Sequence, residues 1–258
     1  MMDFCLKPDQ IHVFFTQADD IKDEYLLSQY QRVISQTEQA KMDRYVFEKD
    51  KHVCLVTRAL LRFVLSLVTR ELPAGFEFIE NPYGKPSIKP GFIDIPLKFN
   101  LSHSENVSVC AIVLNHEIGV DIEYIRRKID LNIPERFFTQ YESAYIKSLA
   151  EEDRQKAFFR LWTLKESYIK AKGMGLSISL DAFGFDIDGQ NTLCRFHESL
   201  NDRSEHWDFF RFSLLNDYKA AIAVQSCRKS AFELKIYNCI PFQEIQEQKN
   251  IQGIHSTK

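Results

Sequence analysis

The order in which strand and helix patterns follow one another constrains the fold of this chain more than any single motif. An alternating segment at residues 11–16 predicts a first strand, and residues 21–70 carry the apolar spacing of helices. Strand patterns come next, then a second helical region that ends with residues 151–172, and then strands again. Chains that group strands and helices in this way form α+β folds. The predicted fold is therefore α+β, with a seam near residues 115–118.

The other expected strands are short apolar or aromatic runs between turn-forming residues. They lie at residues 76–79, 97–101, 107–113, 118–124, 183–187, 192–197, 207–214, 218–224 and 232–237. Leu215, Asn216 and Asp217 are expected to turn one hairpin. Residues 243–258 are polar, and we expect them to be disordered.

Local signals also mark the ends of helices. Ser35 and Glu38 fit a capping box, in which the serine side chain accepts a backbone N–H and the glutamate reaches back to the serine N–H. Gly173 stands where a helix commonly ends, and Lys170 and Lys172 place positive charge in the preceding turn.

Composition and charge exclude several classes of protein. The chain has 258 residues, 45% of them hydrophobic, and a formal net charge of −3, so it lacks the basic surplus of a nucleic-acid or anionic-membrane binder. The six cysteines include no C-x-x-C pair, which favours free, mostly buried thiols. The apolar stretch at residues 60–68 is interrupted by Arg62, and the first residues lack the pattern of a signal peptide. We therefore expect a cytoplasmic protein with no nucleic-acid or membrane partner.

Asp121 and Glu123 are the first candidate site residues. On a strand they share one face, while Ile118, Val120 and Ile122 share the other. Two neighbouring carboxylates repel each other unless a cation lies over them, and oxygen ligands suit a hard ion such as Mg²⁺. The alternative is a strand with a solvated polar face.

Glu166 is the second candidate. It falls on the same helical stripe as Phe158, Trp162 and Ile169, and a carboxylate on an apolar stripe is costly without a cation or a metal. Lys170 follows one turn later, at a spacing that favours an ion pair with Glu166. The alternative is an ordinary helical salt bridge at the edge of the core.

Lys85, Ser102 and His103 form a third set. Lys85 lies in a turn, where it can contact a phosphate as a point charge. His103 stands between Ser102 and Ser104 after a predicted strand, and no second ligand at zinc spacing accompanies it. A structural histidine is the alternative.

Together and in this order, these segments resemble the Sfp-type 4'-phosphopantetheinyl transferase superfamily. The resemblance is carried by Y-G-K-P at residues 83–86, F-N-L-S-H-S at 99–104, G-V-D-I-E at 119–123 and W-T-L-K-E-S-Y-I-K-A-K-G-M-G-L at 162–176. It covers about residues 11–185 and fades beyond them.

The resemblance implies two similar α+β halves related by pseudo-two-fold symmetry. Residues 1–116 would form the first half, with coenzyme A nucleotide contacts, and residues 117–242 the second, with the metal and the catalytic residues. It also implies a Mg²⁺-dependent, monomeric enzyme that transfers the 4'-phosphopantetheine arm of coenzyme A to a serine of an apo carrier protein. Adenosine 3',5'-bisphosphate would be released.

The same resemblance assigns roles to particular residues. Asp121, Glu123 and Glu166 would hold Mg²⁺, Glu166 would deprotonate the serine directly or through a metal-bound water, and Lys170 would stabilise charge on the phosphate. The implied coenzyme A contacts are Lys49, Lys85, Ser102, His103 and Lys165. The chain departs from the family at Lys49, where arginine is common, and at Asp43, which is basic in some members. Residues 124–138, which include Arg126, Arg127, Lys128, Phe137 and Phe138, would meet the carrier, and a solvated basic loop is the alternative.

Two rival functions remain open at this level. One is a metal-dependent phosphohydrolase or nuclease that uses the same three acids, although such enzymes often hold two metals and need more ligands. The other is a degenerate family member that binds coenzyme A or a carrier without transfer.

Overall fold

The computed structural model describes residues 4–130, 132–188, 191–226, 232–249, 251 and 255–256. The chain forms two compact units. The first comprises Met1–Asn81, Pro86–Asn115 and Ala231–Lys249, and the second comprises Pro82–Lys85, His116–Ser230 and Asn250–Lys258. The fold is α+β, as the order of sequence patterns predicted.

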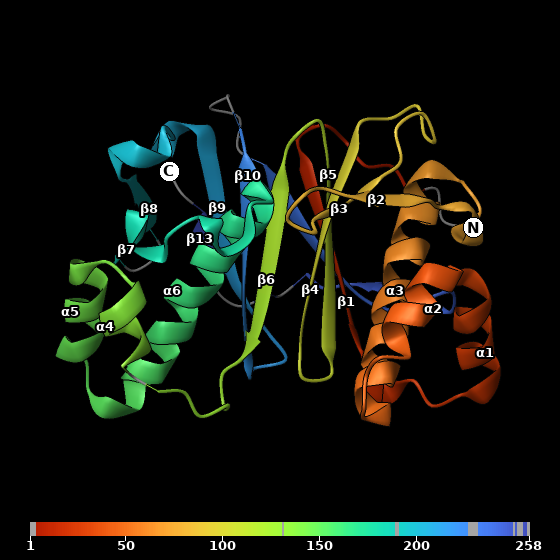
Figure 1. Ribbon diagram of the computed structural model, residues 1–258, viewed down its shortest axis with the longest axis horizontal. Coiled ribbons are helices and arrows are strands. Elements are labelled where there is room, and N and C mark those ends of the chain that lie inside the picture. Colours follow the sequence, from red (N-terminus) through yellow and green to blue (C-terminus); the bar gives the residue numbers. More distant parts are fainter. Residues whose placement is uncertain are drawn as a thin grey trace. The chain divides into compact units, whose positions relative to one another are not determined.

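The first unit is a five-stranded sheet with helices (Figure 1). Its elements are β1 (Gln10–Gln17), α1 (Glu24–Val33), α2 (Gln36–Met42), α3 (Glu48–Thr69), β2 (Phe78–Glu80), β3 (Pro86–Ile88), β4 (Leu97–Ser104), β5 (Val107–Leu114), β11 (Glu233–Ile240) and β12 (Glu244–Glu247). The sheet order is β12-β11-β1-β5-β4, and β2 and β3 form a separate hairpin.

Helix α3 contributes a fully buried apolar face to the core of the first unit. Leu60, Leu61, Val64 and Leu65 are fully buried in one apolar cluster with Phe14 of β1. By length and hydropathy alone α3 could cross a membrane, but 56% of its apolar window is buried inside the protein. Buried core helices of globular domains are also long and apolar. The hydropathy of α3 is therefore explained by its place in the core.

The end of the chain corrects two expectations. We expected the strand near residues 232–237 in the second half, but β11 pairs in parallel with β1 of the first unit. We expected disorder from residue 243, but β12 pairs with β11, and β13 (His255–Ser256) pairs with β9 of the second unit. Alternation alone could not reveal these pairings, because it does not specify which sheet a strand joins.

The second unit is a four-stranded sheet with three helices. Its elements are β6 (Ile118–Tyr124), α4 (Ile133–Phe137), α5 (Gln140–Ser148), α6 (Glu151–Lys172), β7 (Phe183–Asp188), β8 (Asn191–Phe196), β9 (Trp207–Leu214), β10 (Tyr218–Gln225) and β13. The sheet order is β13-β9-β10-β6, and β7 and β8 form a hairpin. The predicted turn between β9 and β10 is present, with left-handed backbone at Leu215 and Asn216.

Both units use one order of elements. A first strand, three helices and two hairpins follow one another in each, from β1 to β5 and from β6 to β10. In both sheets the first strand pairs antiparallel with the last strand of the second hairpin.

A buried ion pair joins α2 to α3 in the first unit. The predicted capping box is confirmed: Ser35 accepts from the Glu38 N–H, and Glu38 accepts from the Ser35 N–H. The same Glu38 carboxylate accepts from Arg62 Nη2 at 2.6 Å and from Nε at 3.0 Å. Arg62 is 0% exposed and also donates to the carbonyl of Pro73 at 2.8 Å. The capping glutamate therefore neutralises a cation in the core.

We predict that Arg62→Met lowers the free energy of unfolding by about 3–5 kcal/mol, because it leaves the Glu38 carboxylate buried without its cation. Urea unfolding measures this loss. Lys147→Met is the control, because the pair of Lys147 with Glu135 is solvent-exposed and is expected to change stability by less than about 1 kcal/mol. Equal losses in the two variants would contradict the account.

Candidate active site

Strand β6 presents Asp121 and Glu123 to helix α6. Both carboxylates lie on the strand face that α6 covers, since Lys170 of α6 contacts Asp121 and both acids act on Glu166 of α6. Asp121 is only 4% exposed, which excludes the alternative of a solvated polar face at this position. Their predicted common face is therefore confirmed; Asp121 is buried on it, and Glu123 is partly exposed.

Lys170 pairs with Asp121. Its Nζ lies 2.6 Å from Asp121 Oδ1. The sequence spacing predicted a pair between Glu166 and Lys170 within the helix; Lys170 does lower the pKa of Glu166, but its close ion pair is with Asp121. Asp121 is more deeply buried than Glu166. Leaving its carboxylate without a cation would therefore cost more free energy, which favours its pair with the Lys170 ammonium.

Glu166 has an unusual electrostatic environment. Its pKa is raised to about 7, first by burial and then by the Asp121 and Glu123 carboxylates, while Lys170 opposes the rise. A carboxylate that shares a half-buried site with two others resists ionisation unless more positive charge is present. The predicted cost of an acid on the apolar stripe of α6 is thus visible as a raised pKa.

Glu123 is held by a residue that the sequence analysis did not assign. Arg127 Nη2 lies 3.4 Å from Glu123 Oε2, and its guanidinium stands over the Phe159 ring. Arg127 follows Glu123 by four residues, a spacing that brings side chains together only where the backbone turns. Nothing in the sequence indicated that the backbone turns directly after β6.

The three acids fit a magnesium site in their chemistry. All donors are carboxylate oxygens, the kind of ligand that Mg²⁺ prefers, and their mutual repulsion is the property that a divalent cation relieves. Within the described part of the chain, no three His, Cys, Asp or Glu side chains already stand in metal-binding geometry. In this structure the Lys170 ammonium provides the positive charge beside Asp121.

Gly119 explains how β6 can lie so close to α6. A Cβ atom at this position would lie 2.0 Å from the Ser167 carbonyl oxygen and 2.3 Å from the Ala171 nitrogen. Both atoms belong to the helix backbone and have little room to move. Glycine therefore allows the strand to approach the helix on the face that carries Asp121 and Glu123.

We predict that Gly119→Ala destabilises the fold by about 1–3 kcal/mol, since the added methyl group has no space. Urea unfolding of Gly75→Ala provides the control, because a Cβ there meets its nearest atom, in Phe92, at 3.5 Å. A Gly119→Ala variant as stable as the control would show that the helix backbone yields at no cost.

Lys165 lies in the core and not at the site. Its Nζ is 2.9 Å from Glu142 Oε2 and donates to the carbonyls of Leu180 and Phe183 at 2.7 and 2.5 Å. The side chain is 0% exposed, and burial lowers its pKa while Glu142 opposes this. This placement contradicts the expectation that Lys165 contacts a phosphate. Thr139 and Glu142 form a capping box that the sequence analysis missed, although T-x-x-E is a visible signal.

Of the remaining predicted contacts, Lys85 belongs to the second unit, and Lys49, Ser102 and His103 belong to the first. Lys49 is exposed in the first turn of α3. Ser102 is buried and His103 is exposed, and both lie within β4 and not after it as expected.

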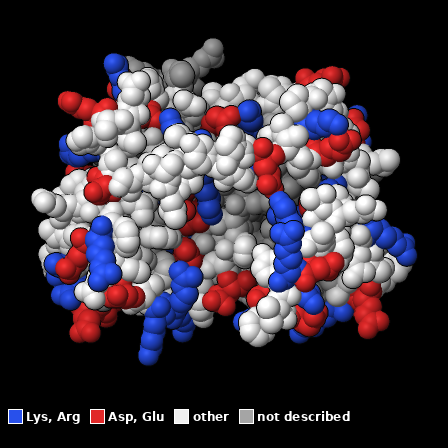
Figure 2. Space-filling model, viewed as in Figure 1, with Lys and Arg blue, Asp and Glu red and all other residues white. Residues whose placement is uncertain are grey.

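The expected carrier-facing stretch, residues 124–138, is partly exposed. Phe137 is 50% exposed, whereas Phe138 is buried and stacks on Phe158. Arg126 pairs with Asp217 at 2.9 Å. Leu131 lies outside the described residues. Figure 2 shows acidic and basic side chains interspersed on the visible face.

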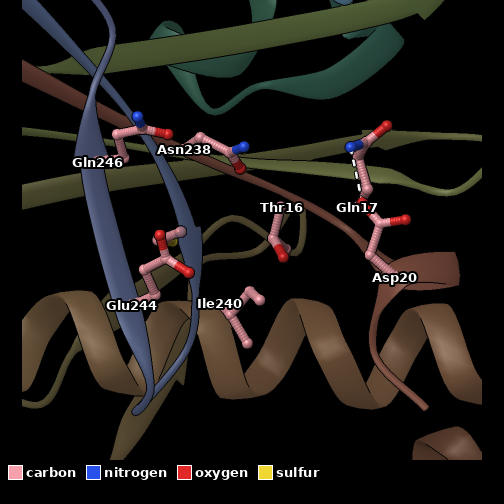
Figure 3. Close-up of a pocket in the computed structure, with 8 residues that line it drawn as sticks. Thr16, Gln17, Asp20, Asn238, Ile240, Glu244 and Gln246 are labelled. Carbon is pink, nitrogen blue, oxygen red and sulfur yellow. Dashed lines mark hydrogen bonds between the residues drawn. The ribbon is translucent and has the colours of Figure 1, made fainter.

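Two hollows in the first unit lie apart from these residues. A groove of about 510 Å³ between α2, α3 and β2 is lined in part by Lys41, Arg58, Phe78 and Glu80. A polar pocket of about 80 Å³ lies near the ends of β1 and β11, where Thr16 and Asn238 are among its lining residues (Figure 3). The second pocket has room for a few water molecules but not for a nucleotide.

We predict a pH-dependent effect of Glu166→Gln in metal-free buffer. Because the folded pKa of Glu166 is raised from 4.5 to about 7, ionisation of this group costs stability as the pH rises through that interval. Relative to the native chain, the variant should gain about 1–2 kcal/mol at pH 8 and almost nothing at pH 4, as measured by urea unfolding. Glu152→Gln, on an exposed position of α6, should show no such pH dependence. A constant effect of Glu166→Gln across this range would contradict the raised pKa.

Two family models match the chain. Residues 21–114 match the model described as 4'-phosphopantetheinyl transferase, N-terminal. Residues 117–223 match the model described as the 4'-phosphopantetheinyl transferase superfamily. The two matched segments meet near the boundary between the two units.

Several curated proteins are similar to this chain. The 4'-phosphopantetheinyl transferase gsp of Aneurinibacillus migulanus is 36% identical over 183 residues, which cover 71% of this chain and 74% of gsp. HetI of Nostoc sp. is 35% identical, covering 67% of this chain and 72% of HetI. Sfp of Bacillus subtilis is 34% identical, covering 62% of this chain and 70% of Sfp.

Among solved structures, the holo-[acyl-carrier-protein] synthase of Thermotoga maritima is 19% identical, with a TM-score of 0.37. The aligned region covers 44% of this chain and 64% of that protein.

The fold and the site define an α+β protein with three clustered carboxylates and a lysine between one strand and one helix. Its identity and coverage against gsp identify the family: the chain belongs to the 4'-phosphopantetheinyl transferase superfamily.

Proposed function

We propose that this chain transfers the 4'-phosphopantetheine arm of coenzyme A to a serine of an apo carrier protein. The observation that carries the proposal is the cluster of Asp121, Glu123, Glu166 and Lys170, assembled from β6 and α6 in a chain of this superfamily. The curated relatives gsp, HetI and Sfp are all named 4'-phosphopantetheinyl transferases.

In the proposed reaction the carrier serine oxygen attacks the β-phosphorus of coenzyme A. The bond from that phosphorus to the bridging oxygen breaks, and adenosine 3',5'-bisphosphate leaves. Glu166 accepts the serine proton. Lys170 places positive charge where negative charge develops on the transferring phosphate.

Asp121, Glu123 and Glu166 would hold Mg²⁺. When bound, this ion would supply charge neutralisation at the pyrophosphate and so ease departure of the leaving group. The ion would then add to the neutralisation of Asp121 to which Lys170 contributes.

Lys49, Ser102 and His103 remain proposed coenzyme A contacts, whereas the Lys85 ammonium is engaged by Glu117, Ile118 and Ala171 of the second unit. We also propose that the two units are the similar halves implied by the family, which their shared order of elements supports. All four proposed catalytic and metal-binding residues come from one unit of one chain, which supports a monomer. The five described cysteines are free, which supports a reducing compartment.

The direct test incubates the chain with coenzyme A, Mg²⁺ and a panel of apo carrier proteins, followed by intact mass spectrometry of the carriers. We predict addition of one phosphopantetheine arm, loss of transfer on chelation with EDTA, and recovery with Mg²⁺ or Mn²⁺. Glu166→Gln should reduce turnover at least about 100-fold, whereas Glu152→Gln on the same helix should leave it unchanged.

Three other outcomes would favour different functions. Coenzyme A binding without transfer to any carrier would favour a binding protein. Release of inorganic phosphate without a carrier would favour a phosphohydrolase. Undiminished transfer in the chelator would remove the metal from the proposal.

A further inference from the structure

We propose that Lys85 is a positioning residue, which fixes the start of β6 against the last turn of α6 and thereby sets the spacing of the carboxylates that these elements carry. The inference rests on the proposed function only where its effect on turnover is measured. It differs from the family-based expectation for Lys85, which is a contact with the nucleotide.

The ammonium of Lys85 reaches three acceptors within the second unit. Its Nζ lies 2.7 Å from the Ala171 carbonyl oxygen, 3.0 Å from Glu117 Oε2 and 3.3 Å from the Ile118 carbonyl oxygen. An ammonium has three protons, and these three acceptors can take all of them. The Lys85 side chain is only 16% exposed, so most of it faces protein.

The three acceptors lie on the two elements that build the site. Ile118 is the first residue of β6, and Glu117 precedes it directly. Ala171 lies in the last turn of α6, where carbonyl groups lack partners within the helix and where positive charge is favourable. One side chain therefore joins the start of the strand to the end of the helix.

The neighbours of these acceptors are the functional residues. At Gly119, next to Ile118, the backbone of α6 leaves no room for a Cβ atom on β6. Asp121 follows two residues later on the same face, and its partner Lys170 is next to Ala171. A shift of β6 relative to α6 at this end would therefore change the 2.6 Å contact between Asp121 and Lys170 directly.

A variant of Glu117 can distinguish a positioning role of Lys85 from a direct contact with the ligand. If Lys85 positions β6, then removing the charge of Glu117 should resemble removing Lys85, because both changes weaken one link. If Lys85 served only to bind a nucleotide, loss of Glu117 would leave its ammonium available, and nucleotide affinity would stay equal or rise.

The test compares Lys85→Met, Glu117→Gln and the double variant with the native chain by hydrogen exchange of the backbone amides at residues 118–121 and 169–172. Lys89→Met is the matched control, because Lys89 pairs with Glu77 in an exposed ion pair. We expect exchange at these amides to rise at least about fivefold in both single variants and not in the control. The double variant should not exceed the larger single effect by more than about twofold, since both residues serve one link.

Two binding measurements complete the test. Mn²⁺ affinity, followed by electron paramagnetic resonance, should fall about tenfold in Lys85→Met and in Glu117→Gln, as for other residues that orient metal ligands. Coenzyme A affinity without metal should stay within about threefold of native. Where transfer is measured, kcat should fall while KM for coenzyme A stays within the same limit.

Several results would overturn the proposal. These are unchanged exchange in Lys85→Met, a rise in exchange spread equally over both units, or a tenfold loss of metal-free coenzyme A affinity in Lys85→Met but not in Glu117→Gln. The exchange experiment decides the matter even if no carrier is modified, so its failure and the failure of the proposed function are distinguishable.

Discussion

The close packing of β6 against α6 is the constraint on which the proposed site depends. Two acids on the strand and one on the helix can share one small volume only if the two backbones nearly touch, and Gly119 permits this. The cost of that proximity appears in Glu166, whose pKa is raised to about 7 by burial and by its acidic neighbours. Lys170 offsets part of the cost by pairing with Asp121. The site therefore holds excess negative charge, which is the property that a divalent cation requires.

A second recurring interaction stabilises both units. Glu38 and Glu142 each cap a short helix, and each also binds a cation that is 0% exposed on the long helix that follows. Arg62 and Lys165 occupy the same position counted from the first residue of α3 and α6. Each also donates to two carbonyls just beyond its helix. Because Arg62 stands in a unit without the carboxylate cluster, its likeness to Lys165 is independent support for a structural role of Lys165.

Much of the local structure could be predicted from the sequence, because it depends on neighbours in the chain. The strand at residues 207–214, the capping box of Ser35 and the common face of Asp121 and Glu123 are examples. The failures involve contacts between distant residues. Helical spacing placed Lys170 beside Glu166 but could not reveal that Asp121 would take its ammonium. The family resemblance assigned Lys165 to a phosphate but could not show that its side chain pairs with Glu142 in the core. Alternation of apolar residues could not assign β11 to the first sheet.

The central claim is that the acids of β6 and α6 form one cation site in the second unit. Crystals grown with coenzyme A and Mn²⁺, with diffraction recorded at the manganese absorption edge, test it most directly. The account predicts an anomalous peak within coordination distance of oxygens from Asp121, Glu123 and Glu166, with Lys170 Nζ moved from Asp121 Oδ1 toward the phosphates. A manganese peak elsewhere, or one that leaves Glu166 outside its coordination shell, would contradict the account.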